Sequence, residues 1–297
     1  MSRPLEDFLP NTVRTWIKES FHNSLVRDPV STLKYLPSHP GSNSYAVRKS
    51  ETELADGLPI PPTPMWLGYS TTNDEYIEGG QRSTQAMLDA VQATGYELCA
   101  SHRVLDFGCA AGRMIRHLRS WTDSCEVWGC DISGDSMLWA KTHLTPPFRF
   151  FTNTTIPHLP FEDGYFNLIY AASVFTHIED TAEAWLLELR RVLSRQGRLF
   201  ITIQDNHSME LLQKKDSPHR LTQLMTPYKK FREWDDQHLQ LVVGRDRRSA
   251  VFYDLDYFRN HVATMFQIAN VVPECHDFQT GVVLAHPDAA TVAAEVE

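Results

Sequence analysis

The sequence predicts an α/β fold built on a doubly wound, mostly parallel sheet. Two observations support this prediction. Between about residues 102 and 204, short apolar runs alternate with segments of helical periodicity. The first of these runs ends in an acid and two glycines, at residues 104–112, just before a helix is expected. A turn of this kind is typical of a ligand loop at the carboxyl edge of a parallel sheet.

The elements of this sheet are expected in a regular order. The periodicity predicts a helix at 82–98, a strand at 102–107, a helix at 112–120, a strand at 126–131, a helix at 134–144, strands at 148–152 and 166–172, a helix at 180–193 and a strand at 197–204. Asp180 and Glu183 have the spacing of a capping box for the helix at 180–193. A further helix near 254–264 and strands near 266–272 and 280–285 close the chain.

Composition favours one sizeable enzyme domain in a reducing compartment. The chain has 297 residues, 42% of them hydrophobic, and a net charge of −9. This charge argues against general adhesion to nucleic acid or to an anionic membrane. Five cysteines without a C-x-x-C pair indicate free thiols, and no segment has the apolar length of a signal core or a membrane span. We therefore expect a cytoplasmic protein with no nucleic-acid or membrane partner.

Three regions are expected along the chain. Residues 1–80 are irregular and proline-rich, as in an arm or lid, residues 81–288 form the main domain, and residues 289–297 are a tail. Residues 205–250 are longer than a simple crossover and are interpreted as an insertion on the substrate side of the domain. The insertion carries nine basic residues, Lys214, Lys215, Arg220, Lys229, Lys230, Arg232, Arg245, Arg247 and Arg248.

The loop after the first strand places a carboxylate close to a ligand. Asp106 ends the strand, Gly108 permits a tight turn, and Gly112 permits close approach of the backbone to a ligand. A dinucleotide fingerprint would read G-x-G-x-x-G, whereas here Ala110 stands between only two glycines. An acid at this position would repel a pyrophosphate but suits the ammonium group of an amino-acid-like ligand.

Residues 104–113 resemble motif I of the class I S-adenosylmethionine-dependent methyltransferases, V-L-D-x-G-x-G-x-G, with Ala110 in place of the middle glycine. The resemblance implies that Asp106 and the loop hold the amino-acid end of S-adenosylmethionine. The residues of the loop and its flanks that are assigned to this cofactor are Tyr76, Asp106, Gly108, Cys109, Ala110, Gly112, Arg113 and Ser173.

The resemblance continues in the next two strands. A second apolar run ends in Asp131, 19 residues after Gly112, and in the family this acid accepts hydrogen bonds from both ribose hydroxyls. Ile132 would supply an apolar face to the adenine ring, and Asn153 and Thr154 stand where an acid and a small residue flank the adenine in the family.

The last two expected strands extend the resemblance to about residues 82–286. Joined by a link at 273–279, they resemble the antiparallel hairpin that ends the methyltransferase sheet and that dinucleotide dehydrogenase folds lack. The resemblance therefore implies a seven-stranded Rossmann-like methyltransferase fold.

Two histidines are candidate general bases. His177 follows the fourth strand, where the cofactor's methionine moiety and the substrate meet in the family, but it could equally cap a helix or bond a backbone carbonyl. His207, after the fifth strand, is the second candidate. Cys109 lacks the cationic neighbour that a nucleophilic thiol needs. The histidines show neither H-E-x-x-H nor a Cys/His cluster, so no metal is expected.

The arm and the insertion offer substrate-side candidates. Aromatic residues of the arm, Trp16, Trp66, Tyr69 and Tyr76, could close over the cofactor or simply pack on the domain. Tyr76 is the best lid candidate because it directly precedes the helix expected at 82–98. The basic residues of the insertion either favour an anionic small molecule or form a solvated face balanced by Asp235, Asp236 and Asp246.

These observations favour a methyltransferase that transfers a methyl group to oxygen, nitrogen or activated carbon of a small molecule. A catalytically silent methyltransferase-like subunit that binds a partner protein through its arm is the alternative. A nicotinamide-dependent oxidoreductase is a third hypothesis, which the missing third glycine and the expected terminal hairpin oppose.

Overall fold

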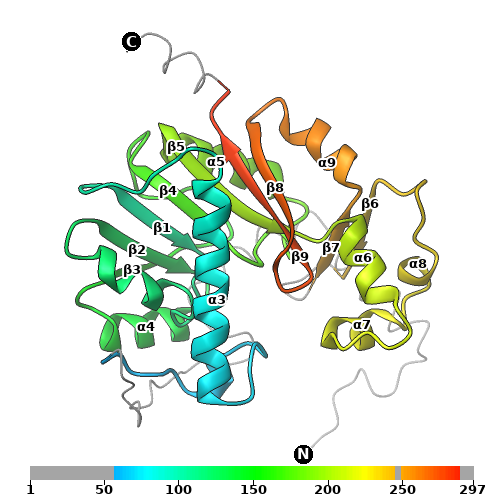
Figure 1. Ribbon diagram of the computed structural model, residues 1–297, viewed down its shortest axis with the longest axis horizontal. Helices are drawn as coiled ribbons and strands as arrows, with labels where there is room; N and C mark the ends of the chain where they lie inside the picture. Colours follow the sequence, from blue (N-terminus) through cyan, green and yellow to red (C-terminus); the bar gives the residue numbers. More distant parts are fainter. Residues whose placement is uncertain (1–56, 245–248, 288–297) are drawn as a thin grey trace, which may run out of the picture.

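The computed structural model describes residues 57–244 and 249–287, which form a seven-stranded sheet with the order β3-β2-β1-β4-β5-β9-β8 (Figure 1). The strands are β1 (Arg103–Phe107), β2 (Glu126–Asp131), β3 (Arg149–Thr152), β4 (Phe166–Ala171), β5 (Leu193–Ile203), β8 (Gln267–His276) and β9 (Gln279–Ala285). β9 pairs antiparallel with both of its neighbours, and the other strand pairs of this sheet are parallel. The expected doubly wound sheet with a C-terminal antiparallel hairpin is confirmed.

Helices cover both faces of the sheet, because successive strand residues point to opposite sides. In β1, Leu105 packs in one hydrophobic cluster with α5 (Ala182–Val192) and α9 (Leu255–Val262), whereas Val104 packs in the other with α3 (Asn73–Gln92), η3 (Ile115–Trp121) and α4 (Gly134–His143). In Figure 1, α3 crosses the near face of the sheet. None of the helices in the described part of the chain has the length and hydropathy needed to cross a membrane.

Helix α3 begins at Asn73, nine residues before the expected start at 82. A capping box fixes this start, because Thr72 accepts a hydrogen bond from the Glu75 amide while the Glu75 side chain accepts one from the Thr72 amide. Gly80 lies inside the helix and allows it to pack closely against the end of the loop that follows β1, residues 108–113, which is called the cofactor loop below. A Cβ on Gly80 would stand 2.3 Å from the carbonyl oxygen of Arg113. The expected boundary at 80/81 therefore falls within this helix.

Several other boundaries also differ from the predictions. The helix expected at 112–120 is the 3₁₀ helix η3. α5 begins at Ala182 after Thr181, so the capping box proposed for Asp180 does not form. β8 continues through Pro273 to His276 and leaves only a two-residue turn before β9, in place of the link expected at 273–279.

The insertion lies beyond the end of β5 (Figure 1) and is joined to the rest of the domain through β7, where the Tyr253 amide donates to the Gln204 carbonyl. It contains α6 (Asn206–Gln213), α7 (Arg220–Met225), α8 (Lys229–Arg232) and an antiparallel pair that the sequence did not predict, β6 (Gln240–Val243) and β7 (Ala250–Tyr253). These elements share a hydrophobic cluster that includes Met209, Leu212, Phe231, Leu241 and Phe252. The insertion thus extends beyond 250 to the end of β7.

The segment before α3 packs on the domain. It contains the short 3₁₀ helix η2 (Thr63–Met65), and the Arg116 guanidinium donates hydrogen bonds to the carbonyl oxygens of Leu58 and Pro59. Trp66 stacks on Tyr76 with ring centroids 5.1 Å apart. Tyr76 lies within α3 and is buried, so it is not part of a lid that precedes the helix. Trp16 lies outside the described residues.

Candidate active site

The loop after β1 is anchored to the end of β2. The Gly108 and Cys109 amides donate hydrogen bonds to the Cys130 carbonyl at 2.8 and 2.9 Å. Ala110 adopts a left-handed conformation with φ of +47°, and its amide donates to the Asp131 carboxylate at 2.8 Å. A left-handed alanine costs about 1 kcal/mol, and the charged hydrogen bond offsets this cost. The loop therefore keeps its shape without the family's middle glycine.

Asp131 has acceptor capacity left over after it braces this loop. Its second oxygen accepts the Ser133 amide at 2.7 Å. Burial raises the pKa of its carboxyl group, and the bonds from the Ser133 and Ala110 amides oppose this rise. A carboxylate offers about four acceptor sites and these two amides use two of them. Two vicinal hydroxyls of a ribose would match the remainder.

Asp106 is a buried carboxyl group at the end of β1, only 3% exposed. Burial raises its pKa to about 7, while the nearby Tyr170 hydroxyl and Arg113 guanidinium lower it. Tyr170 acts on this pKa by proximity, but neither its hydroxyl nor Oδ2 of Asp106 makes a well-formed hydrogen bond within the described chain. A buried acceptor without a donor costs free energy, so this carboxyl group is poised for a ligand.

Arg113 is a buried cation beside Asp106, 8% exposed. Its guanidinium makes long contacts, 3.3 Å to the Ser83 hydroxyl and 3.4 Å to Nε2 of His276, and it stacks on the Tyr69 ring at 4.2 Å. Within residues 57–244 and 249–287, no carboxylate oxygen lies within the 4 Å of an ion pair with it. The guanidinium carries five donors, and its contacts with Ser83 and His276 are both long.

His276 is a site residue that the sequence analysis missed. It ends β8 and lies against Arg113 and Tyr69. Burial, with a further contribution from Arg113, lowers its pKa to about 3, so the ring is neutral and Nε2 accepts from the guanidinium. No local pattern marks this histidine, because only the hairpin brings it beside residue 113.

The residues assigned to adenine lie at the ends of β2 and β3. Asn153 is buried, and its backbone amide donates to the Asp131 carbonyl at 3.2 Å. Its side-chain oxygen Oδ1 has no hydrogen-bond partner in the described chain. The Thr154 hydroxyl accepts the Ile156 amide, and Ile132 is half-buried. A free buried oxygen beside an apolar side chain suits the exocyclic amine of adenine.

The two candidate bases have different surroundings. Nδ1 of His177 lies 2.6 Å from the Ser249 carbonyl oxygen, and the Ser249 hydroxyl donates to the His177 carbonyl. Because a carbonyl only accepts, Nδ1 carries the proton, and Nε2 of a neutral ring is left as an acceptor. His207 instead pairs with Glu274 at 2.8 Å, beside a cavity of about 370 Å³ lined by acidic residues.

Cys109 is not equipped as a nucleophile. The thiol is buried, and burial together with Asp106 and Asp131 raises its pKa well above the usual value. In the described part of the chain, no group of three His, Cys, Asp or Glu side chains could hold a metal ion.

Three of the described basic residues of the insertion have different neighbours. Arg220 faces the segment before α3, since a Cβ on Gly68 would stand 2.8 Å from its Nη1. Lys229 pairs with Glu233 at 3.4 Å, and Arg232 donates to a backbone carbonyl. Arg245, Arg247 and Arg248 lie outside the described residues.

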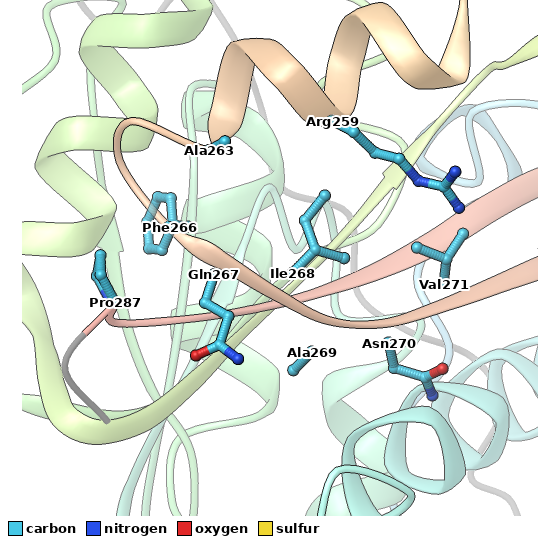
Figure 2. A pocket seen from close by; sticks show the side chains of 9 residues that line it. All are labelled: Arg259, Ala263, Phe266, Gln267, Ile268, Ala269, Asn270, Val271 and Pro287. Atoms are coloured by element: carbon cyan, nitrogen blue, oxygen red, sulfur yellow. The ribbon is translucent and has the colours of Figure 1, made fainter. Parts of the chain in front are cut away.

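A cavity of about 700 Å³ lies along the outer edge of β8 (Figure 2). Its lining comes from Arg259 and Ala263 of α9, from residues 266–271 and from Pro287. These β8 residues form the first half of the strand, toward the amino ends of the parallel strands, whereas the loop at 108–112 lies at their carboxyl ends. The cavity is thus separate from the candidate active site.

Comparisons with known proteins agree with the fold and the loop. A family model described as a methyltransferase domain matches residues 105–201. Methyltransferase GfsG of Streptomyces halstedii is 28% identical over 132 residues, 43% of this chain and 45% of that protein. The matched region spans less than half the length of this relative. A solved S-adenosylmethionine-dependent methyltransferase of Clostridium acetobutylicum shares the fold with 10% identity and a TM-score of 0.50, covering 69% of this chain and 91% of that one.

Proposed function

We propose that this chain, which matches a family model described as a methyltransferase domain over residues 105–201, is a class I S-adenosylmethionine-dependent methyltransferase that methylates a small molecule. The observation that carries the proposal is the pairing of Asp106 with Arg113. Both side chains are buried, Oδ2 of Asp106 has no hydrogen-bond partner in the described chain, and the Arg113 guanidinium lies close enough to lower the pKa of Asp106. A carboxylate and a guanidinium arranged in this way complement the ammonium and carboxylate of an α-amino acid.

The remaining contacts fit the rest of the cofactor. Asp131 would accept the ribose hydroxyls, and the free Oδ1 of Asn153 would accept the adenine amine, with Ile132 against the ring. S-adenosylmethionine supplies an electrophilic methyl group. The chain's residues hold the ends of this cofactor, and His177 would take the proton from the substrate's attacking atom through Nε2. Ser173 would lie beside the methionine moiety.

A small-molecule substrate is supported by the charge and by the framing of the site. A net charge of −9 does not favour a nucleic-acid substrate. The insertion and the segment at 57–72 meet where Arg220 approaches Gly68, and we propose that they wall the substrate site. The proposed preference for an anionic substrate would rest on the insertion's basic residues, of which Lys229 and Arg232 have separate partners.

Transfer of a labelled methyl group tests the proposal. The purified chain would be incubated with methyl-labelled S-adenosylmethionine and a metabolite extract, and labelled products would be identified by mass spectrometry. Labelled small molecules, absent without the chain, would support the proposal. Cofactor binding without any transfer, together with stable co-purification of a partner protein, would favour the silent-subunit alternative. Binding of NAD in place of S-adenosylmethionine would contradict both.

The Asp131→Ala variant is expected to bind S-adenosylhomocysteine at least about tenfold more weakly. The change removes two ribose hydrogen bonds to a charged acceptor, worth about 1.5 to 3 kcal/mol each at most, and also the brace on Ala110. Asp131→Asn keeps one oxygen acceptor, and its affinity for S-adenosylhomocysteine should lie between those of the parent and of Asp131→Ala. Isothermal titration calorimetry measures both variants, and an unchanged affinity of Asp131→Ala would refute the ribose assignment.

Cofactor affinity should rise with pH between 5.5 and 7.5. Asp106 must be ionised to bind an ammonium group, and its pKa of about 7 in the free chain means that most of it is protonated at pH 5.5. We therefore expect affinity for S-adenosylmethionine to be at least about tenfold lower at pH 5.5 than at pH 7.5. Calorimetry in two buffers of different ionisation enthalpy should show proton release on binding at pH 6.

The Asp106→Asn variant supplies the control. It should bind weakly at all pH values and lose the pH dependence. Because the folded pKa lies above the unfolded value, ionisation of Asp106 destabilises the free chain as pH rises from about 4 to 7. Asp106→Asn should therefore melt at a higher temperature than the parent at pH 8. A pH dependence of affinity that is retained in the variant would assign it to another group.

A further inference from the structure

Three buried or half-buried side chains, one from the loop after β4 and one each from β5 and β9, form a closed hydrogen-bond network at the carboxyl edge of the sheet. Thr202 near the end of β5 accepts the Ser173 amide at 2.7 Å and donates to Oε1 of Gln279 at 2.6 Å. Nε2 of Gln279 donates to the Ser173 hydroxyl at 2.8 Å. Gln279 is the first residue of β9 and is 8% exposed, and Thr202 is fully buried.

The network holds Ser173 in an unusual conformation. Its φ is +56°, in the left-handed region that residues other than glycine, asparagine and aspartate seldom adopt. Such a conformation persists only where surrounding contacts determine it. Here the amide and the hydroxyl of Ser173 are both engaged, by Thr202 and Gln279.

The conformation of Ser173 sets the course of the loop after β4. The next residue, Val174, lies close to Gly108 of the cofactor loop. A Cβ on Gly108 would stand 2.4 Å from Cγ2 of Val174. The far end of the loop is fixed separately, because the Thr176 carbonyl accepts the Val251 amide and Nδ1 of His177 donates to Ser249. The loop thus spans from the cofactor loop to the candidate base.

We propose that Gln279 is a positioning residue for methyl transfer, acting with Thr202 through Ser173 to hold the loop at 172–177 against the cofactor loop. This inference rests on the proposed function. The side chain of Gln279 bonds Ser173 and Thr202 and none of the residues proposed to hold the charged groups, ribose or adenine of the cofactor, and its amide groups are used within the network. Its contribution is therefore expected in turnover, where misplacement of reacting groups is costly, and not in cofactor affinity.

Three variants test this role. Gln279→Leu keeps the approximate volume and removes the amide, and Thr202→Val removes the hydroxyl that links Ser173 to Gln279. Thr280→Val is the matched control, because Thr280 is also fully buried in β9 but its hydroxyl has no partner in the described chain. Each variant is measured for labelled-methyl transfer, for S-adenosylhomocysteine affinity, and for deuterium exchange of a peptide that covers residues 172–177.

Gln279→Leu and Thr202→Val should each lower turnover about tenfold or more, with affinity changed less than about threefold. The double variant should lose little more than the worse single variant, because both changes break one network. Exchange at 172–177 should rise in both and stay unchanged in Thr280→Val. Full turnover in Gln279→Leu, or losses of turnover that add in the double variant, would overturn the inference. The proposed function would still stand in that case, provided that the parent chain is active. If the parent transfers no label, the proposed function fails, and unchanged exchange in Gln279→Leu would then overturn the proposed network role.

Discussion

The Gly112→Val variant is expected to lose cofactor binding to a degree beyond any other single change, by at least about a hundredfold. Gly112 has φ of +89°, where a β-branched side chain is strongly disfavoured. A Cβ at this position would also stand 2.6 Å from Cδ1 of Leu144 and 3.3 Å from Cγ2 of Ile115. Side-chain movement can relieve these contacts but not the backbone strain at φ of +89°, so we expect the loop that bears Ala110 and the Arg113 backbone to shift, and with it the site for the amino-acid end of the cofactor.

Gly95→Val is the control for backbone strain. Gly95 has a similar left-handed conformation, with φ of +75°, but nothing lies within 4 Å of a Cβ built there. Both variants should therefore lose stability, by thermal unfolding, while only Gly112→Val should lose affinity for S-adenosylhomocysteine by calorimetry. A Gly112→Val chain that is folded and binds within fivefold of the parent would show that the loop does not approach the cofactor closely.

The His177→Ala variant is expected to lower turnover by about 10² to 10⁴ with cofactor affinity nearly unchanged, if the ring removes a proton during transfer. The Ser249 carbonyl orients the ring and leaves Nε2 free as an acceptor, which is the arrangement a base requires. The measurement is the initial rate of labelled-methyl transfer at saturating cofactor, paired with calorimetry.

His238→Ala tests whether loss of any histidine near the insertion lowers turnover. His238 lies in the insertion and its ring pairs with Asp235 at 2.7 Å. This variant should turn over at nearly the parent rate. A loss below about fivefold in His177→Ala would refute the general-base role and leave alignment of the reactants as the source of catalysis.

Local sequence determined the central strands and the cofactor loop. The expected strand at 126–131 coincides with β2, because its apolar residues are contiguous and its end is marked by Asp131. The start of α3 could also have been found, since Thr72 and Glu75 have capping-box spacing. The glycine at position 80 masked this signal, because glycine disfavours a helix unless another segment needs its small size. The Arg113 backbone, adjacent in space and 33 residues away in sequence, is that segment.

Three features of the candidate site depended on the tertiary structure. The contact of His276 with Arg113, the network of Ser173, Thr202 and Gln279, and the bond from His177 to Ser249 each join residues far apart in sequence. No periodicity or spacing records such pairs, because strand order and hairpin register decide which side chains meet. The pairing of β6 with β7 was likewise invisible, since these short strands gain their apolar surroundings from the helices of the insertion and from the main core.

The sequence by itself determined that a parallel sheet carries an acid and a glycine loop at its carboxyl edge, because strand alternation and turn chemistry are local properties. Only the tertiary structure decided that Asp106 and Arg113 are both buried and that Oδ2 of Asp106 lacks a partner in the described chain. Burial depends on what covers a residue, and here the cover comes from α3, from the segment bearing Tyr69 and from the end of β8. The sequence therefore supplies the charged groups that would hold a zwitterion. The strength of their interaction with it depends on the low-dielectric surroundings that the fold creates.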